Sequence, residues 1–151
     1  MSTSASIELP DDGPCAFCAY LDGSRPYTVL TRNALVGALV TREQRGASHV
    51  LVVSIRHTPT ILDLTDEEAT AVMVLLRHVA GAIDVVEGGP GISIWQNNGT
   101  AAGQAIGHFH IHVAGTNSVG GTEFGEVPEL DVAQTDEIAA RLRRALPAHL
   151  T

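Results

Sequence analysis

Apolar residues recur along the chain in two distinct periods. Runs of β-branched and apolar residues of strand length occupy 27–31, 34–40 and 49–55, and a further run occupies 91–98. Each run is bounded by turn-forming residues or by a change to helical spacing. We therefore expect four strands here, in addition to one that follows the small-residue stretch GTAAGQAIG.

Two segments instead show the 3.6-residue period of an amphipathic helix. The first begins at a capping box formed by Thr65 and Glu68, and it ends at Gly88, where Gly-Gly-Pro stops the periodic pattern. The second covers roughly 135–146 and is ended by Pro147.

The order of these elements predicts the fold class. Strands come first, then a long helix, strands again and a short helix, which is not a repeating βαβ series. We therefore expect an α+β fold with a mostly antiparallel sheet. Residues 1–14 are predicted to form a flexible N-terminal arm and 15–151 a single domain, within which 115–130 has no regular pattern.

The segment GHFHIHVAG places three of the chain's seven histidines at alternate positions. On a strand, His108, His110 and His112 would project from one face, while Phe109 and its alternate neighbours would point into the core. Three interpretations follow from the residues alone: an exposed polar face, a metal site, or nucleophilic and acid–base catalysis by imidazole.

Composition narrows these options. The net charge of −8 argues against broad electrostatic binding of nucleic acid, and the absence of lysine excludes Schiff-base chemistry. The sequence shows neither a secretory signal nor an uncharged apolar run long enough to span a membrane, so we expect a cytoplasmic protein. In that compartment Cys15 and Cys18 are expected to be thiols or metal ligands rather than a disulfide.

The segment HFHIHVA resembles the H-φ-H-φ-H-φ-φ signature of the histidine-triad superfamily, in which φ is an apolar residue. CAFC, GASHVLVVSIRH, LTDEE and NNGTAAGQAIGHFHIHV also occur in that family's order and at roughly its spacing, over about residues 15–115. The resemblance implies a homodimer whose central strands join into one sheet. It also implies a cleft for a purine nucleotide or nucleotide conjugate, and hydrolysis or transfer at the α-phosphate.

The resemblance implies a separate role for each catalytic histidine. His110 would be the nucleophile, with its Nδ1 proton held by the main-chain carbonyl of His108. His112 would contact the phosphate and help to protonate the leaving group. His49 would support the triad by hydrogen bonding.

The nucleotide contacts are implied in the same way. Asn97 would hold the ribose or the α-phosphate region, Gln104 would bond a phosphate oxygen, and the loop would offer main-chain N–H groups at Gly103 and Ala105. Ala105 stands where many nucleoside phosphoramidases of the family have serine. The base and ribose would lie near four residues of the first half of the chain: Phe17, Tyr20, Leu39 and Thr41.

The family's zinc-bearing members imply a structural zinc site made by Cys15, Cys18, His57 and His108. The C-x-x-C pattern alone is weak, and a redox role would require it to begin a helix after a strand, which the sequence pattern does not indicate. For the whole chain we expect a phosphoramidase-like nucleotide hydrolase. A dinucleoside polyphosphate hydrolase, a nucleotide-binding or interaction module with little turnover, and a zinc-structured protein without catalysis remain open.

Overall fold

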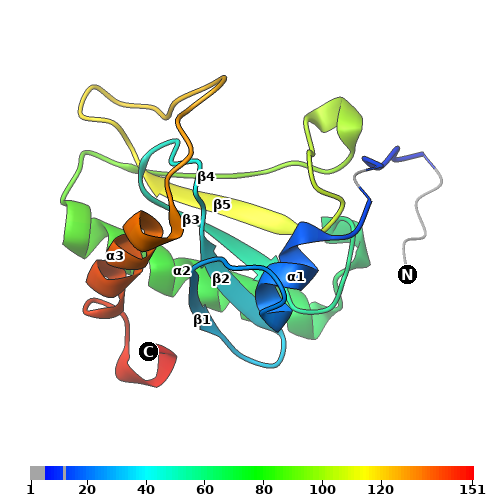
Figure 1. Ribbon diagram of the computed structural model, residues 1–151, viewed down its shortest axis with the longest axis horizontal. Coiled ribbons are helices and arrows are strands. Elements are labelled where there is room, and N and C mark those ends of the chain that lie inside the picture. The colour runs from blue at the N-terminus through cyan, green and yellow to red at the C-terminus, as the bar shows by residue number, and fades with distance from the viewer. Residues whose placement is uncertain (1–5, 12) are drawn as a thin grey trace.

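The computed structural model describes residues 6–11 and 13–151. Its centre is a five-stranded sheet in which every neighbouring pair is antiparallel, so the predicted α+β class is confirmed (Figure 1). The strand order is β1 (Val29–Arg32), β2 (Val36–Val40), β3 (Ala47–Ser54), β5 (His110–Gly115) and β4 (Ile92–Gln96).

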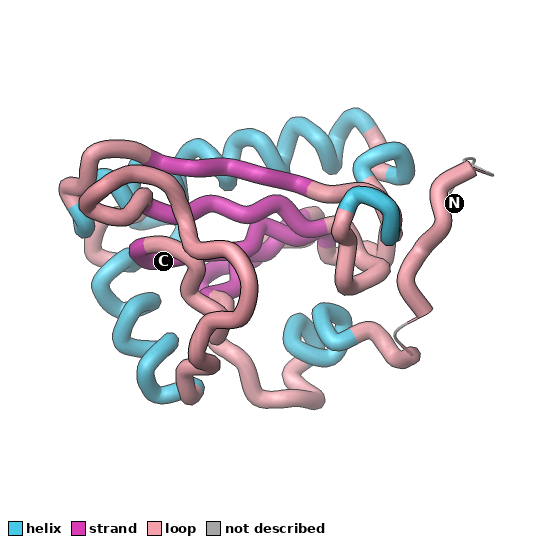
Figure 2. The backbone as a smooth tube through the Cα atoms, turned by 90° about the horizontal axis from the view of Figure 1, so that it is seen from above, coloured by secondary structure: helices cyan, strands magenta, loops and turns pink. Residues whose placement is uncertain are grey.

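Three α-helices surround the sheet: α1 (Ala16–Asp22), α2 (Asp66–Glu87) and α3 (Val132–Arg143). The 3₁₀ turns η1 (Ile61–Asp63), η2 (Thr100–Ala102) and η3 (Ala148–Leu150) complete the elements. Figure 2 shows α2 running along one face of the sheet, with most of the long loops on the other. Helix α3 packs against α2 and the edge formed by β1 and β2.

Strands β2 and β3 are buried on both faces, because each face of the sheet packs into a different apolar cluster. Ala38 and Val52 point towards α2 and belong to the larger core, which also contains Val79 and Leu142. The neighbouring odd-numbered residues of β2 and β3 face the other way, towards α1, and form a smaller core. Helix α1 covers only one end of this second face (Figure 1).

The capping box predicted at Thr65 and Glu68 is present and begins α2. Glu68 is nearly buried, and its carboxylate accepts two hydrogen bonds from Arg56 in addition to one from the Thr65 amide. The hydrogen bonds from Arg56 lower the pKa of the Glu68 carboxyl group and burial raises it. The first effect is larger, so the pKa of Glu68 is lowered. By length and composition alone α2 could cross a membrane, but its inward face supplies much of the core of this sheet–helix layer.

Two helices differ from the sequence prediction. Helix α3 begins at Val132, earlier than the predicted 135, because Asp131 and Gln134 form a capping box of its own. Helix α1 was not predicted: CAFC does begin a helix, in which the Cys15 sulfur accepts a hydrogen bond from the Cys18 amide. Seven residues with a Gly23 C-cap are too few for a periodic apolar pattern to appear.

The proposed N-terminal arm is described in part, since residues 1–5 and 12 lie outside the described residues. The main-chain oxygen of Glu8 accepts hydrogen bonds from the amide and hydroxyl of Thr100, in η2. Residues 6–11 therefore lie against the loop that precedes the histidine strand.

Candidate functional site

The histidine strand separates its three imidazoles into different surroundings. His108 comes just before β5 and is fully buried, whereas His110 and His112 lie half-buried on the strand itself. Nδ1 of His110 lies 2.8 Å from the main-chain oxygen of His108. Because a carbonyl can only accept, Nδ1 carries the proton, and the lone pair of His110 is on Nε2.

His112 is held by two side chains from neighbouring strands. Its Nδ1 lies 3.0 Å from Nε2 of His49, and its ring stacks on Trp95, with 4.7 Å between the ring centroids and 6° between the ring planes. His49 lies within a register shift of β3 between Ala47 and Val50, where Ser48 has a φ of 52°.

Burial keeps all of these imidazoles neutral near pH 7. It is the main cause that lowers the pKa of His49 to about 4 and that of His112 to about 3. Burial also lowers the pKa of His110, and the hydrogen bond to the His108 carbonyl opposes this in part. Neutral imidazole is the form in which nitrogen can act as a nucleophile.

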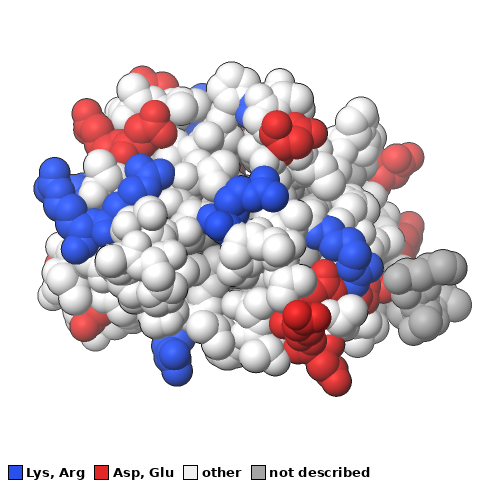
Figure 3. All heavy atoms as spheres, turned by 90° about the horizontal axis from the view of Figure 1, so that it is seen from below, with Lys and Arg blue, Asp and Glu red and all other residues white. Residues whose placement is uncertain are grey.

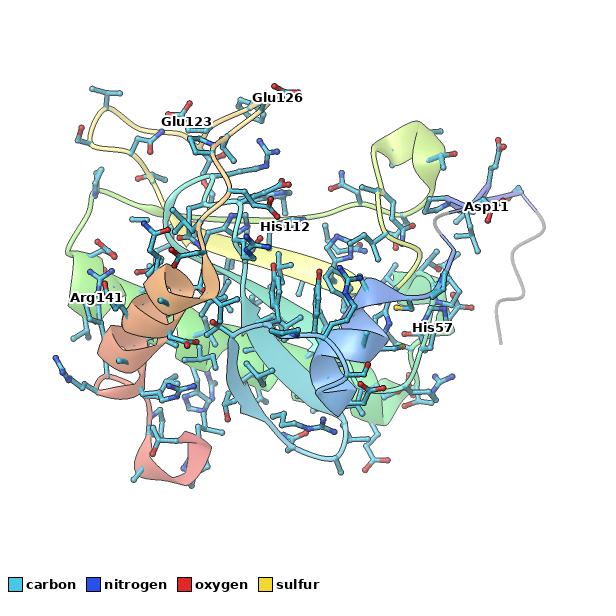
Figure 4. All side chains as sticks on the ribbon, in the orientation of Figure 1. Asp11, His57, His112, Glu123, Glu126 and Arg141 are labelled. Carbon is cyan, nitrogen blue, oxygen red and sulfur yellow. The ribbon has the colours of Figure 1, made fainter. Side chains whose placement is uncertain are left out.

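His110 and His112 open into a cleft of about 760 Å³, which is within the range of small-molecule sites. One wall comes from β4 and the loop before β5, and the other from the β2–β3 loop and the irregular segment that follows β5. Figure 4 shows His112 beneath the loop that carries Glu123 and Glu126, with His57 at the other end of the strand. The lining residues are Glu43, Arg45, Ser93, Ile94, Trp95, Asn97, Gly103, Ala105, His110, His112, Thr122, Glu123, Phe124 and Gly125.

Three of the four predicted loop residues line this cleft: Asn97, Gly103 and Ala105. Gln104 does not have the expected exposure. It is 4% exposed, its Oε1 accepts from the Gly99 amide, and its Nε2 donates to Pro59 and Ile106 carbonyls. The side-chain amide of Gln104 thus stabilises the loop through main-chain hydrogen bonds. Both of its N–H donors are used in this way, so in this conformation it does not offer the expected bond to a phosphate oxygen.

The residues expected near the base and ribose lie together on the α1 side of the sheet. Phe17 and Leu39 are 2% and 0% exposed and share the smaller core with half-buried Tyr20. The ring of Phe17 meets that of His110 edge-on, with centroids 5.0 Å apart. Thr41 is buried, and its hydroxyl accepts a hydrogen bond from the Glu43 amide.

The structure brings the four predicted metal ligands into one cluster. One donor atom from each of Cys15, Cys18, His57 and His108 can be chosen so that all four lie within 4.8 Å of one another. Nδ1 of His108 is 3.2 Å from Nδ1 of His57, 3.3 Å from the Cys15 sulfur and 3.6 Å from the Cys18 sulfur.

These separations fit a tetrahedral zinc ion. With Zn–N near 2.05 Å and Zn–S near 2.3 Å, tetrahedral geometry puts nitrogens ~3.3 Å apart and nitrogen and sulfur ~3.6 Å apart. Nε2 of His108 donates to the main-chain oxygen of Ser54 at 2.7 Å, which leaves the Nδ1 lone pair facing the cluster. Without a cation, burial followed by the neighbouring Cys15 raises the pKa of Cys18 to about 11, so thiolates here require a compensating positive charge.

Several residues of the cleft were not predicted from the sequence. Trp95 lies in a strand that reads only as apolar, and its stacking on His112 depends on the pairing of β4 with β5. Arg45 and Thr122–Gly125 belong to loops without a periodic signal. Segment 115–130, which has no regular sequence pattern, contributes Thr122–Gly125 to the lining of the cleft.

Comparison with known proteins now identifies the family. The model of the HIT domain matches residues 23–119, which is well over half of the chain. This chain belongs to the HIT domain family. It is 27% identical over 135 residues to adenosine 5′-monophosphoramidase hnt1 of Schizosaccharomyces pombe, a match that covers 85% of this chain and 98% of that one.

Other HIT relatives carry names of different hydrolases. Adenylylsulfatase HINT3 of Arabidopsis thaliana is 27% identical over 66% of this chain and 50% of its own. The asymmetrical bis(5′-nucleosyl)-tetraphosphatase of S. pombe is 33% identical over 56% of this chain and 47% of its own. These relatives are therefore named for three different hydrolytic activities.

Solved structures show the same fold. A HIT-like protein from Bartonella henselae superposes with a TM-score of 0.82 at 20% identity, covering 92% of this chain and all of that one. A zinc-bound histidine triad family protein from Mycobacterium smegmatis gives a TM-score of 0.74 at 24% identity, covering 87% of this chain and 91% of that one.

Proposed function

We propose that this protein is a nucleotide hydrolase that cleaves at the α-phosphate through a nucleotidyl-His110 intermediate. The observation that carries the proposal is the 2.8 Å contact between His110 Nδ1 and the His108 carbonyl. It fixes the tautomer in which Nε2 is an unprotonated nucleophile on the cleft side of the strand. The main-chain N–H group of Ala105, across the cleft, would bind a phosphate oxygen, whereas the N–H group of Gly103 donates to the Thr100 carbonyl at 3.0 Å and is not offered to a ligand.

The proposed reaction has two displacements. The Nε2 lone pair of His110 forms a bond to phosphorus, and the bond from phosphorus to the leaving group breaks as that group takes a proton from His112. Water then attacks phosphorus and gives a proton to His112 as the bond between phosphorus and His110 Nε2 breaks, which releases the nucleotide and restores His110.

His49 has partners for both of its tautomers, which suits the alternating role of His112. Nδ1 of His49 lies 3.1 Å from the Arg45 amide, a donor, and 3.1 Å from the Glu43 carbonyl, an acceptor. In the first arrangement His49 donates to His112, which keeps its proton on Nε2. In the second, Nε2 of His49 accepts from a protonated His112, and Nδ1 of His49 donates to the Glu43 carbonyl.

The proposed substrate is a purine nucleotide conjugate, with a phosphoramidase-like reaction as the first candidate, by analogy with the S. pombe relative. The base would lie near Phe17, Tyr20, Leu39 and Thr41, and Asn97 would hold the ribose or α-phosphate region. Ala105 supplies no hydroxyl, which favours the second candidate, a dinucleoside polyphosphate hydrolase whose leaving group is less dependent on such a donor.

We further propose a structural zinc ion held by the Cys15, Cys18, His57 and His108 cluster. When bound, zinc would neutralise the two thiolates and fix the start of the histidine strand. The donor separations and the His108–Ser54 hydrogen bond support this, and so does the zinc-bound M. smegmatis relative.

A homodimer in the cytoplasm completes the proposal. Strand β4 forms one edge of the sheet, and Ile92 and Ile94 on it are exposed, as are Met73 and Val85 of α2. An apolar edge strand is suited to pairing with a second copy. Light scattering at micromolar concentration should give the mass of two chains, and a mass of one chain would contradict this part of the proposal.

The decisive experiment compares His110→Ala with wild type on adenosine 5′-phosphoramidate. Loss of the covalent nucleophile should lower kcat by many orders of magnitude, while nucleotide affinity changes little because the loop donors remain. Rapid quenching without acid, followed by mass spectrometry, should find the adenylyl group on His110 in wild type. His112→Ala is the matched variant and should lose only ~10²–10⁴-fold, the range of a general acid.

Retention of more than about a tenth of wild-type kcat by His110→Ala would refute nucleophilic catalysis. Nucleotide binding without turnover of any adenylate by the wild type would instead favour the binding module.

A further inference from the structure

The proposed reaction determines where the leaving group must lie. Displacement at phosphorus is in line, so the leaving group departs on the side of phosphorus opposite His110. His112 must also reach it in order to give it a proton. The leaving group therefore occupies the part of the cleft beside His112, where Trp95, Arg45 and segment 122–125 form the walls.

Arg45 is fixed in this part of the cleft by contacts at both of its ends. Its amide donates to Nδ1 of His49 at 3.1 Å, and its Nη1 donates to the main-chain oxygen of Gly125. The amide of Glu123 donates back to the Arg45 carbonyl at 2.7 Å. The guanidinium is thus anchored to segment 122–125 rather than extended into solvent, and its charge adds to the effect of burial in lowering the pKa values of His49 and His112.

Arg45 is the cationic side chain that could bind an anionic leaving group in this part of the cleft. Arg45 is the only arginine lining the cleft among the residues that the structure describes, and the chain contains no lysine. Two carboxylates are close to Arg45, but neither forms a short, buried ion pair with its guanidinium. Glu43 Oε2 lies 3.4 Å from Nη2 of Arg45 with its side chain 57% exposed, and Glu123 accepts from the side chain of Asn117 on its own loop.

A guanidinium has five N–H donors, and the contacts to Gly125, Glu123 and Glu43 do not use all of them. Its side chain is only 26% exposed, so a bond to an anion would be screened less than at an open surface. A planar donor set of this kind matches phosphate and sulfate oxygens.

We infer that Arg45 is a specificity-determining residue that favours substrates whose leaving group is anionic, such as a phosphate chain or a sulfate. The inference rests on the proposed function, because it takes its geometry from attack by His110. It adds a preference that the triad itself does not impose. An uncharged leaving group, such as ammonia, would gain nothing from the guanidinium.

The test uses three substrates that share an adenylyl group and differ in what is released. Adenosine 5′-phosphoramidate has an uncharged leaving group, adenosine 5′-phosphosulfate releases sulfate, and diadenosine tetraphosphate releases ATP, which departs through its anionic phosphate chain. The readout is the ratio of kcat/KM for each anionic substrate to that for the phosphoramidate, measured on the full-length protein. Because each ratio is internal to one variant, a general loss of folded protein cancels.

Arg45→Gln should lower both ratios by about 10- to 100-fold, which is the size of one charge-assisted hydrogen bond. A fall in only one ratio would assign the contact to sulfate or to polyphosphate. Arg42→Gln is the matched control, because Arg42 lies on the same loop and also holds segment 115–130, through the Leu130 carbonyl, yet does not line the cleft. Its ratios should stay within about twofold of wild type.

Glu43→Gln provides a second variant with the opposite sign. It removes the negative charge beside Arg45 and should raise both ratios by about two- to fivefold, as expected for an exposed ion pair. If Arg45→Gln is too unstable to assay, this variant decides, and unchanged or lowered ratios would overturn the inference.

Unchanged ratios in Arg45→Gln would also overturn it and would leave Arg45 as a brace for segment 122–125. If the wild type hydrolyses none of the three substrates, the proposed function fails, and this inference fails with it. Turnover of all three with ratios indifferent to Arg45 would refute the inference alone.

Discussion

Replacing His49 by Gln should change how the stability of the protein depends on pH. His49 is 2% exposed, and burial is the main cause that lowers its pKa from 6.5 to about 4. In the unfolded chain the same imidazole titrates near its ordinary pKa of about 6.5. Between these two values the unfolded state binds a proton that the folded state does not, so the free energy of unfolding falls as the pH falls.

The size of the effect follows from the two pKa values. Each pH unit between them is worth about 1.36 kcal/mol. From pH 6.5 down to pH 4.5 the wild type should therefore lose roughly 2–3 kcal/mol through His49 alone. Above pH 6.5 the group is neutral in both states and contributes no pH dependence. Gln cannot titrate, so His49→Gln should lack this part of the acid destabilisation.

Urea unfolding at pH 7.5 and pH 4.5 checks this prediction. At pH 7.5 the variant should be less stable, because Gln replaces the hydrogen bonds to His112 and the Arg45 amide imperfectly. At pH 4.5 the difference from wild type should have closed by about 2–3 kcal/mol. His149→Gln, a substitution at an exposed position, is the control and should run parallel to wild type. A His49→Gln curve that also stays parallel would refute the assignment of His49 as a buried neutral group.

Three further predictions concern stability. Chelation of zinc should lower the unfolding temperature without complete unfolding, because this domain has a core of its own. The zinc-binding free energy of ~10–16 kcal/mol in zinc-finger peptides is therefore an upper bound for the stability lost. Metal analysis of unchelated protein should give one zinc per chain. Gly46→Ala should destabilise by about 1–3 kcal/mol, because a Cβ there overlaps a main-chain oxygen of β5, whereas Gly81→Ala in α2 meets no atom within 4 Å and should stabilise by ~0.5–1 kcal/mol. Arg56→Met should destabilise the protein more than Arg141→Met, because it leaves the buried carboxylate of Glu68 without its cation, whereas the Arg141–Glu87 pair is longer and its carboxylate is less buried. Equal costs in denaturant titrations would contradict the burial argument.

Local signals in the sequence predicted most of the framework. The Thr65 capping box and the helical spacing after it located α2, and the alternation of histidine with apolar residues located the strand and its faces. Phe109 and Val113 are buried as that alternation requires. Helix α1 escaped prediction because a seven-residue helix capped by a cysteine sulfur has neither periodicity nor a conventional N-cap.

The walls of the cleft depend on contacts that sequence patterns do not encode. Arg45 is bonded to residues 78 and 80 positions away, and Trp95 faces His112 only because β4 pairs with β5 in this register. Gln104 shows the converse, since the family resemblance implied a contact with a phosphate oxygen, while its side-chain amide is bonded to main-chain groups.

Surface charge does not by itself locate the site. Acidic and basic side chains are interspersed on the face shown in Figure 3, so an anionic ligand would depend on local donors in the cleft.

The alternation of the three histidines links the Cys15, Cys18, His57 and His108 cluster to the proposed chemistry through the main chain. His108 is held by the Ser54 carbonyl on one ring nitrogen and by the donor cluster on the other, so its backbone has little freedom. The carbonyl that orients His110 belongs to this same residue. Two residues further along, His112 meets a different support, His49 and Trp95. A strand is the element that allows this division, because it points all three rings to one face while keeping each out of the others' hydrogen bonds. A helix would bring such neighbours to different faces, and the carbonyl of the first histidine would then be used by the helix itself.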